Sequence, residues 1–493
     1  MTAVRSKADT PYLRWAVILI GGMLLFRLLM LLLSASGLHG DEAQYWAWSR
    51  EPDFGYYSKP PLIAWVIWIT TSLFGHEEWA VRLASPFLHT GTAILTYLSA
   101  SRLFDQRAGL IASALYILMP GVALSASLIS TDAALLLFVA LFIHSWIRLR
   151  EQASWGWALM LGAALGLGLM AKYAMIYILP AFSLALLFDI KTRHALLDLK
   201  GLAAAGMTML IITPNLIWNQ RNSFATLQHT TDNANMGDGV QLNPLELVEF
   251  LVGQLGVFGP VTFILLIIAL WRVRQNRDQF RLWLCILILT PLLVICVQAL
   301  LSRANANWAA AAYGAAPLLL AGWALRSRRA MRWVMAGLSL NLLMSLVPPL
   351  VLMSPSLTDQ LGFANAVKRQ RGWPDTVDAI AARYGTGDFD AIAVDNRLMF
   401  YALTYYGMED TAPLFMWRYE PRLNNHAEMT RPLPEDDRSV LLISYYPTYA
   451  DYFARDFDRL TRLGEIEIEL GGGKSRALTA YAAQGYKGPV PRE

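Results

Sequence analysis

Residues 15–33 read WAVILIGGMLLFRLLMLLL and carry a single charge, at Arg27. An apolar run of this length is sufficient for one helix to cross the hydrocarbon core of a bilayer. No small-residue cleavage site follows it, so we expect the segment to remain as a membrane anchor and not to be removed as a signal peptide. The whole chain is also rich in apolar residues: 55% of its 493 residues are hydrophobic and only 16% are charged. The composition therefore predicts a membrane protein.

Apolar runs of similar length recur up to about residue 355 and predict a polytopic α-helical protein with about eleven transmembrane helices. Their approximate positions are 15–33, 79–101, 108–128, 132–148, 155–170, 173–188, 201–217, 249–271, 282–301, 308–325 and 333–353. A further stretch, Pro61–Phe74, is apolar but short and contains Trp65 and Trp68. This pattern is typical of an amphipathic helix that lies in the membrane interface.

The distribution of Lys and Arg predicts the orientation of these spans, because cytoplasmic loops carry an excess of both residues. With a cytoplasmic N-terminus, the inner segments hold eighteen such residues. The outer loops hold five: Arg50, Lys59, Lys172, Arg221 and Arg303. An odd number of spans then places the residues after 355 in the periplasm of a Gram-negative cell. The net charge of +4 is too small to indicate a nucleic-acid partner, and we expect none.

Residues 356–493 alternate between helical and strand patterns and predict a small α/β domain. Helices are expected at Thr376–Tyr384, Arg397–Tyr406 and Tyr449–Leu460. Short buried strands are expected at Asp390–Val394 and Ser439–Ser444, and a hairpin at Glu465–Leu470 and Ala477–Tyr481. Gly471–Gly473 lies between the two hairpin strands, so it is interpreted as a turn and not as a phosphate-binding loop.

Charged and polar residues collect at the predicted outer ends of the spans. They are Asp41, Glu42, Lys59, Asp132, Lys172, Arg303, Asn307 and Trp308. Ionisable groups at the depth of a membrane are costly, which makes such a set a candidate functional site. Carboxylates that face Lys and Arg are expected where a base and an anionic leaving group must coexist.

Each of these residues also has a structural interpretation. Asp132 follows Ser130-Thr131 and precedes an apolar run, which is the pattern of a helix N-cap. Lys172 could extend to the interface only as an anchor. Asp41 and Glu42 could be an ordinary solvated pair in the first loop. The aromatic residues of that loop suit sugar binding and an interfacial aromatic belt equally well.

Several ordered motifs extend across the first 330 residues or so, each on the predicted outer side. They are Asp41-Glu42-Ala43-Gln44-Tyr45-Trp46, Gly55-Tyr56-Tyr57-Ser58-Lys59-Pro60-Pro61, Thr131-Asp132, Ala171-Lys172-Tyr173, Pro214-Asn215-Leu216-Ile217-Trp218-Asn219 and Ala306-Asn307-Trp308. This set resembles the GT-C membrane glycosyltransferases that use polyprenyl-phosphate sugars. Within them it is most similar to the bacterial branch related to protein O-mannosyltransferases and to the lipid A aminoarabinose transferase.

The resemblance implies a role for each matched residue. Asp41, with Glu42 beside it, corresponds to the catalytic carboxylate, and Asp132 to the second acidic position. The basic residues expected to bind the donor phosphate are Lys59, Lys172 and Arg303. The residues expected to contact substrate are Tyr45, Tyr57, Asn219, Asn307 and Trp308. Ser58 replaces an acidic residue that relatives use in a proposed metal site, so a divalent metal is left open and none is predicted.

The resemblance also implies the architecture and the reaction. Residues 1–355 would form a GT-C catalytic domain with a first periplasmic loop at 34–78, and residues 356–493 a periplasmic α/β domain. A monomer in the inner membrane, with its active site facing the periplasm, would move one sugar with inversion. The donor would be a polyprenyl monophosphate, and the acceptor would be lipid A or lipopolysaccharide core. Transfer to protein hydroxyls, and a polytopic lipid or sugar transporter or flippase, remain alternatives.

Overall fold

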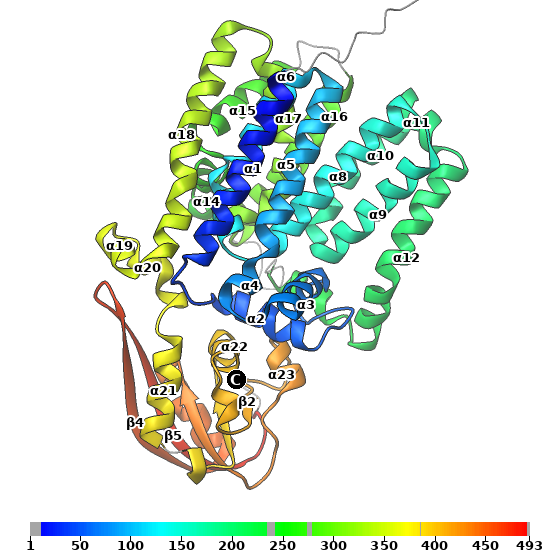
Figure 1. Ribbon diagram of the computed structural model, residues 1–493. Helices are drawn as coiled ribbons and strands as arrows, with labels where there is room; N and C mark the ends of the chain where they lie inside the picture. The colour runs from blue at the N-terminus through cyan, green and yellow to red at the C-terminus, as the bar shows by residue number, and fades with distance from the viewer. Residues whose placement is uncertain (1–10, 234–241, 274–278, 385, 491–493) are drawn as a thin grey trace, which may run out of the picture. The chain divides into compact units, whose positions relative to one another are not determined.

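The computed structural model describes residues 11–233, 242–273, 279–384 and 386–490. The chain divides into two compact units (Figure 1). The helical unit comprises residues 1–33, 59–66 and 82–350, and the sheet unit comprises residues 34–58, 67–81 and 351–493. Most of the first loop therefore groups with the C-terminal residues and not with the helices that flank it in sequence.

The helical unit is built from consecutive helices, several of them broken by short 3-10 turns. They are α1 Pro11–Leu32, α5 Ala84–Leu103, α6 Gln106–Ile117, α7 Pro120–Ser127, α8 Thr131–Glu151, α9 Trp155–Ala171, η1 Tyr173–Ile178, α10 Leu179–Phe188, α11 Ile190–Leu196, α12 Leu199–Arg221, α13 Ala225–Asn233, α14 Pro244–Phe258, α15 Pro260–Val273, α16 Gln279–Leu301, η2 Ala306–Gly314, α17 Ala316–Ala324 and α18 Arg328–Met353. The short apolar stretch after the first loop forms α3, Leu62–Phe74, and is followed by α4, Glu78–Arg82.

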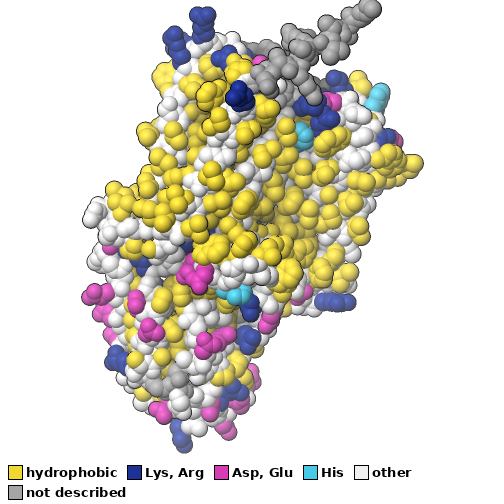
Figure 2. Space-filling view, viewed as in Figure 1, with side chains coloured by type: hydrophobic (Ala, Val, Ile, Leu, Met, Phe, Trp, Pro, Cys, Tyr) yellow, Lys and Arg dark blue, Asp and Glu magenta, His cyan; other side chains and the backbone are white. Residues whose placement is uncertain are grey.

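Among the described residues, five helices are long and apolar enough to cross a membrane, and three bent helix pairs raise the number to as many as eight. A polytopic helical membrane protein is therefore confirmed. Figure 2 shows hydrophobic side chains over the helical unit, with Lys and Arg at the end where α18 begins. Arg102, Arg148 and Arg150 lie in the last turns of α5 and α8. A lipid-facing surface with one basic end agrees with the charge pattern of the sequence.

The segment 249–271, predicted as one span, is not a single straight helix. The chain bends by 107° between α14 and α15. Gly259 lies at the bend with φ of +95°, and a Cβ there would lie 1.8 Å from Asn341 Oδ1. Asn341 Nδ2 donates to the carbonyl of Phe258 at 3.1 Å, which satisfies a helix end that Pro260 cannot continue. The bend depends on this long-range contact as well as on the Gly-Pro pair.

In its described residues, the sheet unit contains five strands in the order β2-β1-β3-β5-β4. The strands are β1 Ala391–Val394, β2 Leu414–Met416, β3 Ser439–Ser444, β4 Phe457–Gly471 and β5 Lys474–Tyr486. β1 pairs in parallel with β2 and β3, while β5 is antiparallel to β3 and β4. The core between the sheet and its helices holds Trp417, Val440, Leu442, Phe453 and Tyr481.

Helices α22 Arg397–Tyr405 and α23 His426–Thr430 pack beside the parallel strands, and α21 Trp373–Tyr384 and α24 Ala450–Asp456 pack beside β4. Helix α2 Gly40–Arg50 packs against α22. The predicted helix Tyr449–Leu460 is wrong over its last four residues, because β4 begins at Phe457. The spacing of Phe457 and Leu460 suits a helix, but pairing with β5 places both residues in a strand instead. The first loop is tied to this unit, since Leu38 N–H donates to Tyr406 Oη at 3.0 Å.

Candidate active site

Asp132 lies at the start of α8 and is buried, with 6% of its surface exposed. Lys172 Nζ donates to its Oδ1 at 2.6 Å, and Asn307 Nδ2 donates to its Oδ2 at 2.7 Å. Each oxygen of the carboxylate therefore accepts a hydrogen bond from a side chain that is far from Asp132 in sequence. The N-terminal end of α8 also favours a negative charge at this position.

Lys172 owes its position to a break in the helices. It ends α9 with extended backbone angles, φ −162° and ψ 132°, and the 3-10 turn η1 follows at once. Only 17% of its side chain is exposed, and its ammonium is paired with Asp132 and not simply extended to solvent. Helices α8 and α9 are consecutive, so this ion pair lies at the end of the helices opposite to Arg148 and Arg150.

A cavity of about 350 Å³ adjoins the ion pair. Its polar lining comprises Ser125, Ser130, Asp132, Asn307 and Tyr313, and the rest is apolar. This volume falls in the range of small-molecule sites, and a few polar groups in an apolar wall are typical of such sites. The cavity could hold a small hydroxylated group beside Asp132.

Asn219 lies in a polar cluster that supports the residue next to Lys172. Tyr173 Oη donates to Asn215 Oδ1 at 2.7 Å, and Asn219 Nδ2 donates to Tyr173 Oη at 3.2 Å. Both asparagines are on α12 and are buried. The cluster therefore fixes η1 from its first residue, and with it the backbone that carries Lys172.

The structure brings together three of the predicted residues, Asp132, Lys172 and Asn307. Trp308 packs against the hydrophobic core of the helical unit. Arg303 is exposed, just before η2, and Lys59 is half-buried, directly before Pro60 and α3. The roles of all these residues remain predictions.

Asp41 belongs to the sheet unit, on the first turn of α2. Its side chain is 47% exposed, and its Oδ1 lies 3.5 Å from Arg397 Nη2. Arg397 Nη1 also donates to Gln44 Oε1 at 2.6 Å, so one guanidinium holds two positions of α2. No motif marked Arg397, because it lies at the start of α22, far along the chain from Asp41.

Glu42 has a structural role in the same helix. It is buried, and its Oε2 accepts from the backbone N–H of His39 at 2.9 Å. His39 Nδ1 in turn accepts from the backbone N–H of Asp41 at 3.2 Å. This reciprocal capping box fixes the start of α2 and hence the position of Asp41.

Tyr45 and Tyr57, predicted to contact substrate, are both buried in the sheet unit. Tyr57 Oη donates to the carbonyl of Leu423 at 2.5 Å. Trp48 stacks on Tyr56 with ring centroids 4.5 Å apart, and His426 lies edge-on to both rings. Burial lowers the pKa of His426 to about 4, so it is neutral at pH 7. These aromatic residues pack the first loop against the residues around α23.

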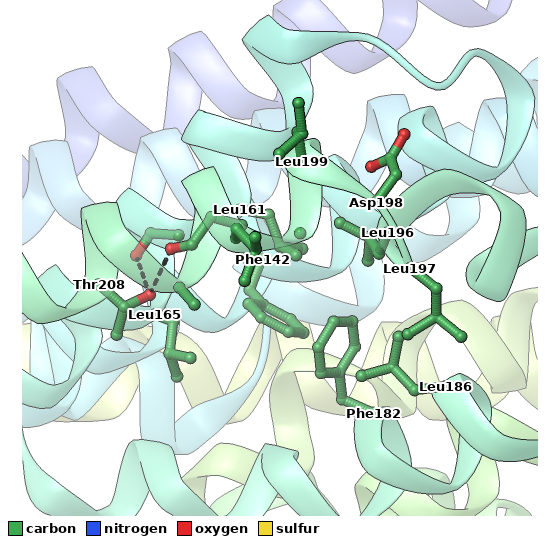
Figure 3. A pocket seen from close by; sticks show the side chains of 15 residues that line it. Phe142, Leu161, Leu165, Phe182, Leu186, Leu196, Leu197, Asp198, Leu199 and Thr208 are labelled. Carbon is green, nitrogen blue, oxygen red and sulfur yellow. Dashed lines mark hydrogen bonds between the residues drawn. The ribbon is translucent and has the colours of Figure 1, made fainter.

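Two further features bear on cofactors and ligands. Among the residues that the structure describes, no group of three or more His, Cys, Asp or Glu is placed to hold a metal ion. A second cavity, of about 750 Å³, is lined by apolar residues of α8 to α12 such as Phe142, Leu161 and Phe182 (Figure 3). Its polar side chains are Thr208, which donates to the carbonyls of Gly162 and Ala204, and Asp198. Its mostly apolar lining suits a hydrocarbon chain and not a sugar.

Comparison with known proteins identifies relatives of this chain. Residues 58–218 match the family model described as dolichyl-phosphate-mannose-protein mannosyltransferase. A lipid A galacturonosyltransferase of Rhizobium johnstonii is 34% identical over 400 residues, which cover 80% of this chain and 82% of that protein. An undecaprenyl phosphate-alpha-4-amino-4-deoxy-L-arabinose arabinosyl transferase of Pseudomonas fluorescens is 33% identical over 190 residues, or 34% of each chain.

Solved structures agree in fold. ArnT from Cupriavidus metallidurans in the apo state aligns with a TM-score of 0.66 and 15% identity, over 96% of this chain and 98% of that chain. The same protein bound to undecaprenyl phosphate aligns with a TM-score of 0.63 and 17% identity over the same shares. By its fold and by its similarity to the galacturonosyltransferase along most of both chains, this protein belongs to the GT-C membrane glycosyltransferases that use polyprenyl-phosphate sugars.

Proposed function

We propose that the protein is an inner-membrane glycosyltransferase that moves one sugar from a polyprenyl monophosphate donor to lipid A or lipopolysaccharide core. The observation that carries the proposal is the buried carboxylate of Asp132, which Lys172 and Asn307 contact beside a cavity of about 350 Å³. The relatives named for lipid A and undecaprenyl phosphate support the substrate classes. We also propose that the protein acts as a monomer.

In this reaction the bond between the anomeric carbon and a phosphate oxygen breaks, and a bond to an acceptor oxygen forms on the opposite face. Negative charge grows on the departing phosphate. Lys172 would stabilise it, assisted by Lys59 and Arg303, and a positioned cation of this kind acts most strongly where water is excluded. The donor phosphate and Asp132 would then compete for the same ammonium, so Asp132 would hold Lys172 ready before the donor binds.

Asp41 would orient the acceptor and accept its proton. Its half-exposed carboxylate can reach a ligand, while Arg397 and the capping box limit its orientation. If the acceptor is a phosphate, little deprotonation is needed, and Asp41 would mainly stabilise positive charge that develops on the sugar. Glu42 would act through the position of α2 and not by touching substrate.

The proposed topology has eleven spans in residues 1–355, with α14 and α15 forming one broken span, and residues 356–493 in the periplasm. The active site would face the periplasm. Reporter fusions after Arg326 and after Pro374 are therefore expected to report opposite sides of the membrane. A report of the same side from both fusions would exclude the eleven-span topology.

A deletion strain tests the substrate class. Mass spectrometry of its lipid A and core oligosaccharide is expected to show the loss of one sugar, restored by the wild-type gene but not by the Asp41→Asn variant. Unchanged lipopolysaccharide together with a lost modification on protein would contradict the proposed acceptor and favour protein O-glycosylation.

A further inference from the structure

The sheet unit has a second feature that the proposed reaction does not use, at the carboxyl ends of its parallel strands. β1 lies between β2 and β3, so the chain leaves β1 toward one neighbour and later returns on its other side. The connection that leaves β1 leads to β2 on one side, and the connection that leaves β2 leads to β3 on the other side. The switch point of the sheet therefore lies between β1 and β3. In open α/β sheets, ligands bind at the carboxyl ends of the strands next to such a switch point.

A buried carboxylate organises this edge of the sheet. Asp395 directly follows β1 and is 7% exposed. It accepts from Ser444 Oγ at 2.6 Å and from the backbone N–H groups of Tyr445 and Tyr446 at 2.8 and 3.3 Å. These three bonds fix the chain where β3 ends. The tyrosines that follow are consequently held in place while their side chains remain 39% and 38% exposed.

Further tyrosines continue the exposed pair into a surface. The ring centroids of Tyr446 and Tyr449 lie 5.0 Å apart. Tyr449 stacks on Tyr419, with ring centroids also 5.0 Å apart and ring planes at 25°. We call Tyr419, Tyr445, Tyr446 and Tyr449 the tyrosine platform. Asn396 Nδ2 donates to Tyr446 Oη at 2.7 Å, so an amide borders the rings.

This combination suits a carbohydrate. Sugar rings have apolar C–H faces that pack on aromatic rings, and hydroxyls that bond to phenols and amides. Four tyrosines with a neighbouring asparagine offer both kinds of contact, whereas a surface for hydrocarbon chains needs no such polar groups.

The platform is also connected to the residue proposed to act on the acceptor. Asn396 borders Tyr446, and the next residue, Arg397, contacts Asp41 at 3.5 Å. Two consecutive residues at the start of α22 therefore join the platform to the carboxylate of Asp41 within the sheet unit.

We propose that the tyrosine platform binds sugar residues of the glycolipid acceptor and presents the acceptor to Asp41. The inference rests on the proposed function, and it deepens that function by assigning the acceptor glycan to the sheet unit. Tyr419, Tyr445, Tyr446 and Tyr449 are then binding residues that determine which glycolipids are accepted.

The test compares the full-length protein in nanodiscs with a Tyr445→Ala/Tyr446→Ala double variant. Binding of deacylated lipopolysaccharide, which keeps its sugars and has no acyl chains, is expected to weaken about tenfold, or about 1.4 kcal/mol. The KM for lipopolysaccharide should rise by a similar factor, while the KM for the donor stays unchanged. A Tyr445→Phe/Tyr446→Phe variant keeps the ring faces and should recover most of the affinity.

Phe363→Ala is the matched control, because Phe363 is 40% exposed in the same unit and lies outside the platform. It should bind deacylated lipopolysaccharide as the wild type does. Unchanged binding and unchanged acceptor KM in the double alanine variant would overturn the inference while wild-type transfer stood. If the wild type transferred no sugar to any lipopolysaccharide, the proposed function itself would fail.

Discussion

Replacing Asp41 by Asn is expected to reduce sugar transfer by on the order of 1,000-fold, within the range for loss of a general base. Asn keeps the shape of the side chain and its amide oxygen can face Arg397, but it cannot take a proton or carry a negative charge. The capping box formed by His39 and Glu42 does not involve the Asp41 side chain, so α2 should stay in place. Single-turnover transfer by the purified variant measures the effect.

Asp53→Asn provides a matched control for this prediction. Asp53 is an exposed carboxylate of the same loop, and the substitution is chemically identical. The control should turn over as the wild type does. An Asp41→Asn variant with near wild-type turnover would show that the carboxylate has no catalytic role, and loss of folded protein would show a structural one.

Replacing Lys172 by Ala is expected to reduce turnover by about 100-fold, as on loss of one preorganised electrostatic donor to a transition-state charge. An Arg replacement should rescue only part of the activity, since a planar guanidinium does not occupy the position of a compact ammonium. Lys200→Ala removes a lysine beside Trp155, at the other end of α9, and should have little effect. Near-normal turnover by Lys172→Ala would reject the phosphate contact.

The ion pair complicates this result, because loss of Lys172 leaves the buried Asp132 without a cationic partner among the contacts of the described residues, although Asn307 still donates to it. Such an unpaired charge is itself destabilising. Binding of undecaprenyl phosphate separates the two effects. Lys172→Ala should weaken it at least about tenfold, whereas Asp132→Asn should leave it equal or stronger, because the ammonium is released for the phosphate. Equal affinities in all three proteins would mean that Lys172 serves only to pair with Asp132.

The sequence was informative about the membrane part of the fold because lipid imposes a simple rule on composition and length. The first span, Trp15–Leu33, corresponds closely to α1, Pro11–Leu32. The bend at Gly259 was not predicted, since it depends on a contact with Asn341 from α18. The same reason explains the error at Phe457, where pairing with β5 overrides a local helical pattern.

For the candidate site, the sequence could identify the residues that carry charge or polarity, but not the side chains with which each of them pairs. Asp132, Lys172 and Asn307 were each at a predicted outer end, and the structure joins them into one group. Tyr45 and Tyr57 show the limit of this reasoning, because an aromatic residue in a loop can face substrate or pack inward, and both are buried. Arg397 and the tyrosine platform come from the C-terminal residues, where no motif marked them.

The central claim is tested most directly by reconstituting the reaction from defined components. Purified protein in nanodiscs would receive a polyprenyl monophosphate carrying one labelled sugar, with lipid A or core-bearing lipopolysaccharide as acceptor. We expect mass spectrometry to show the acceptor heavier by one sugar and the free polyprenyl monophosphate in equal amount, with inverted configuration at the anomeric carbon. Movement of the intact donor between leaflets, without release of its phosphate or any glycosylated acceptor, would contradict the account and show a transporter instead.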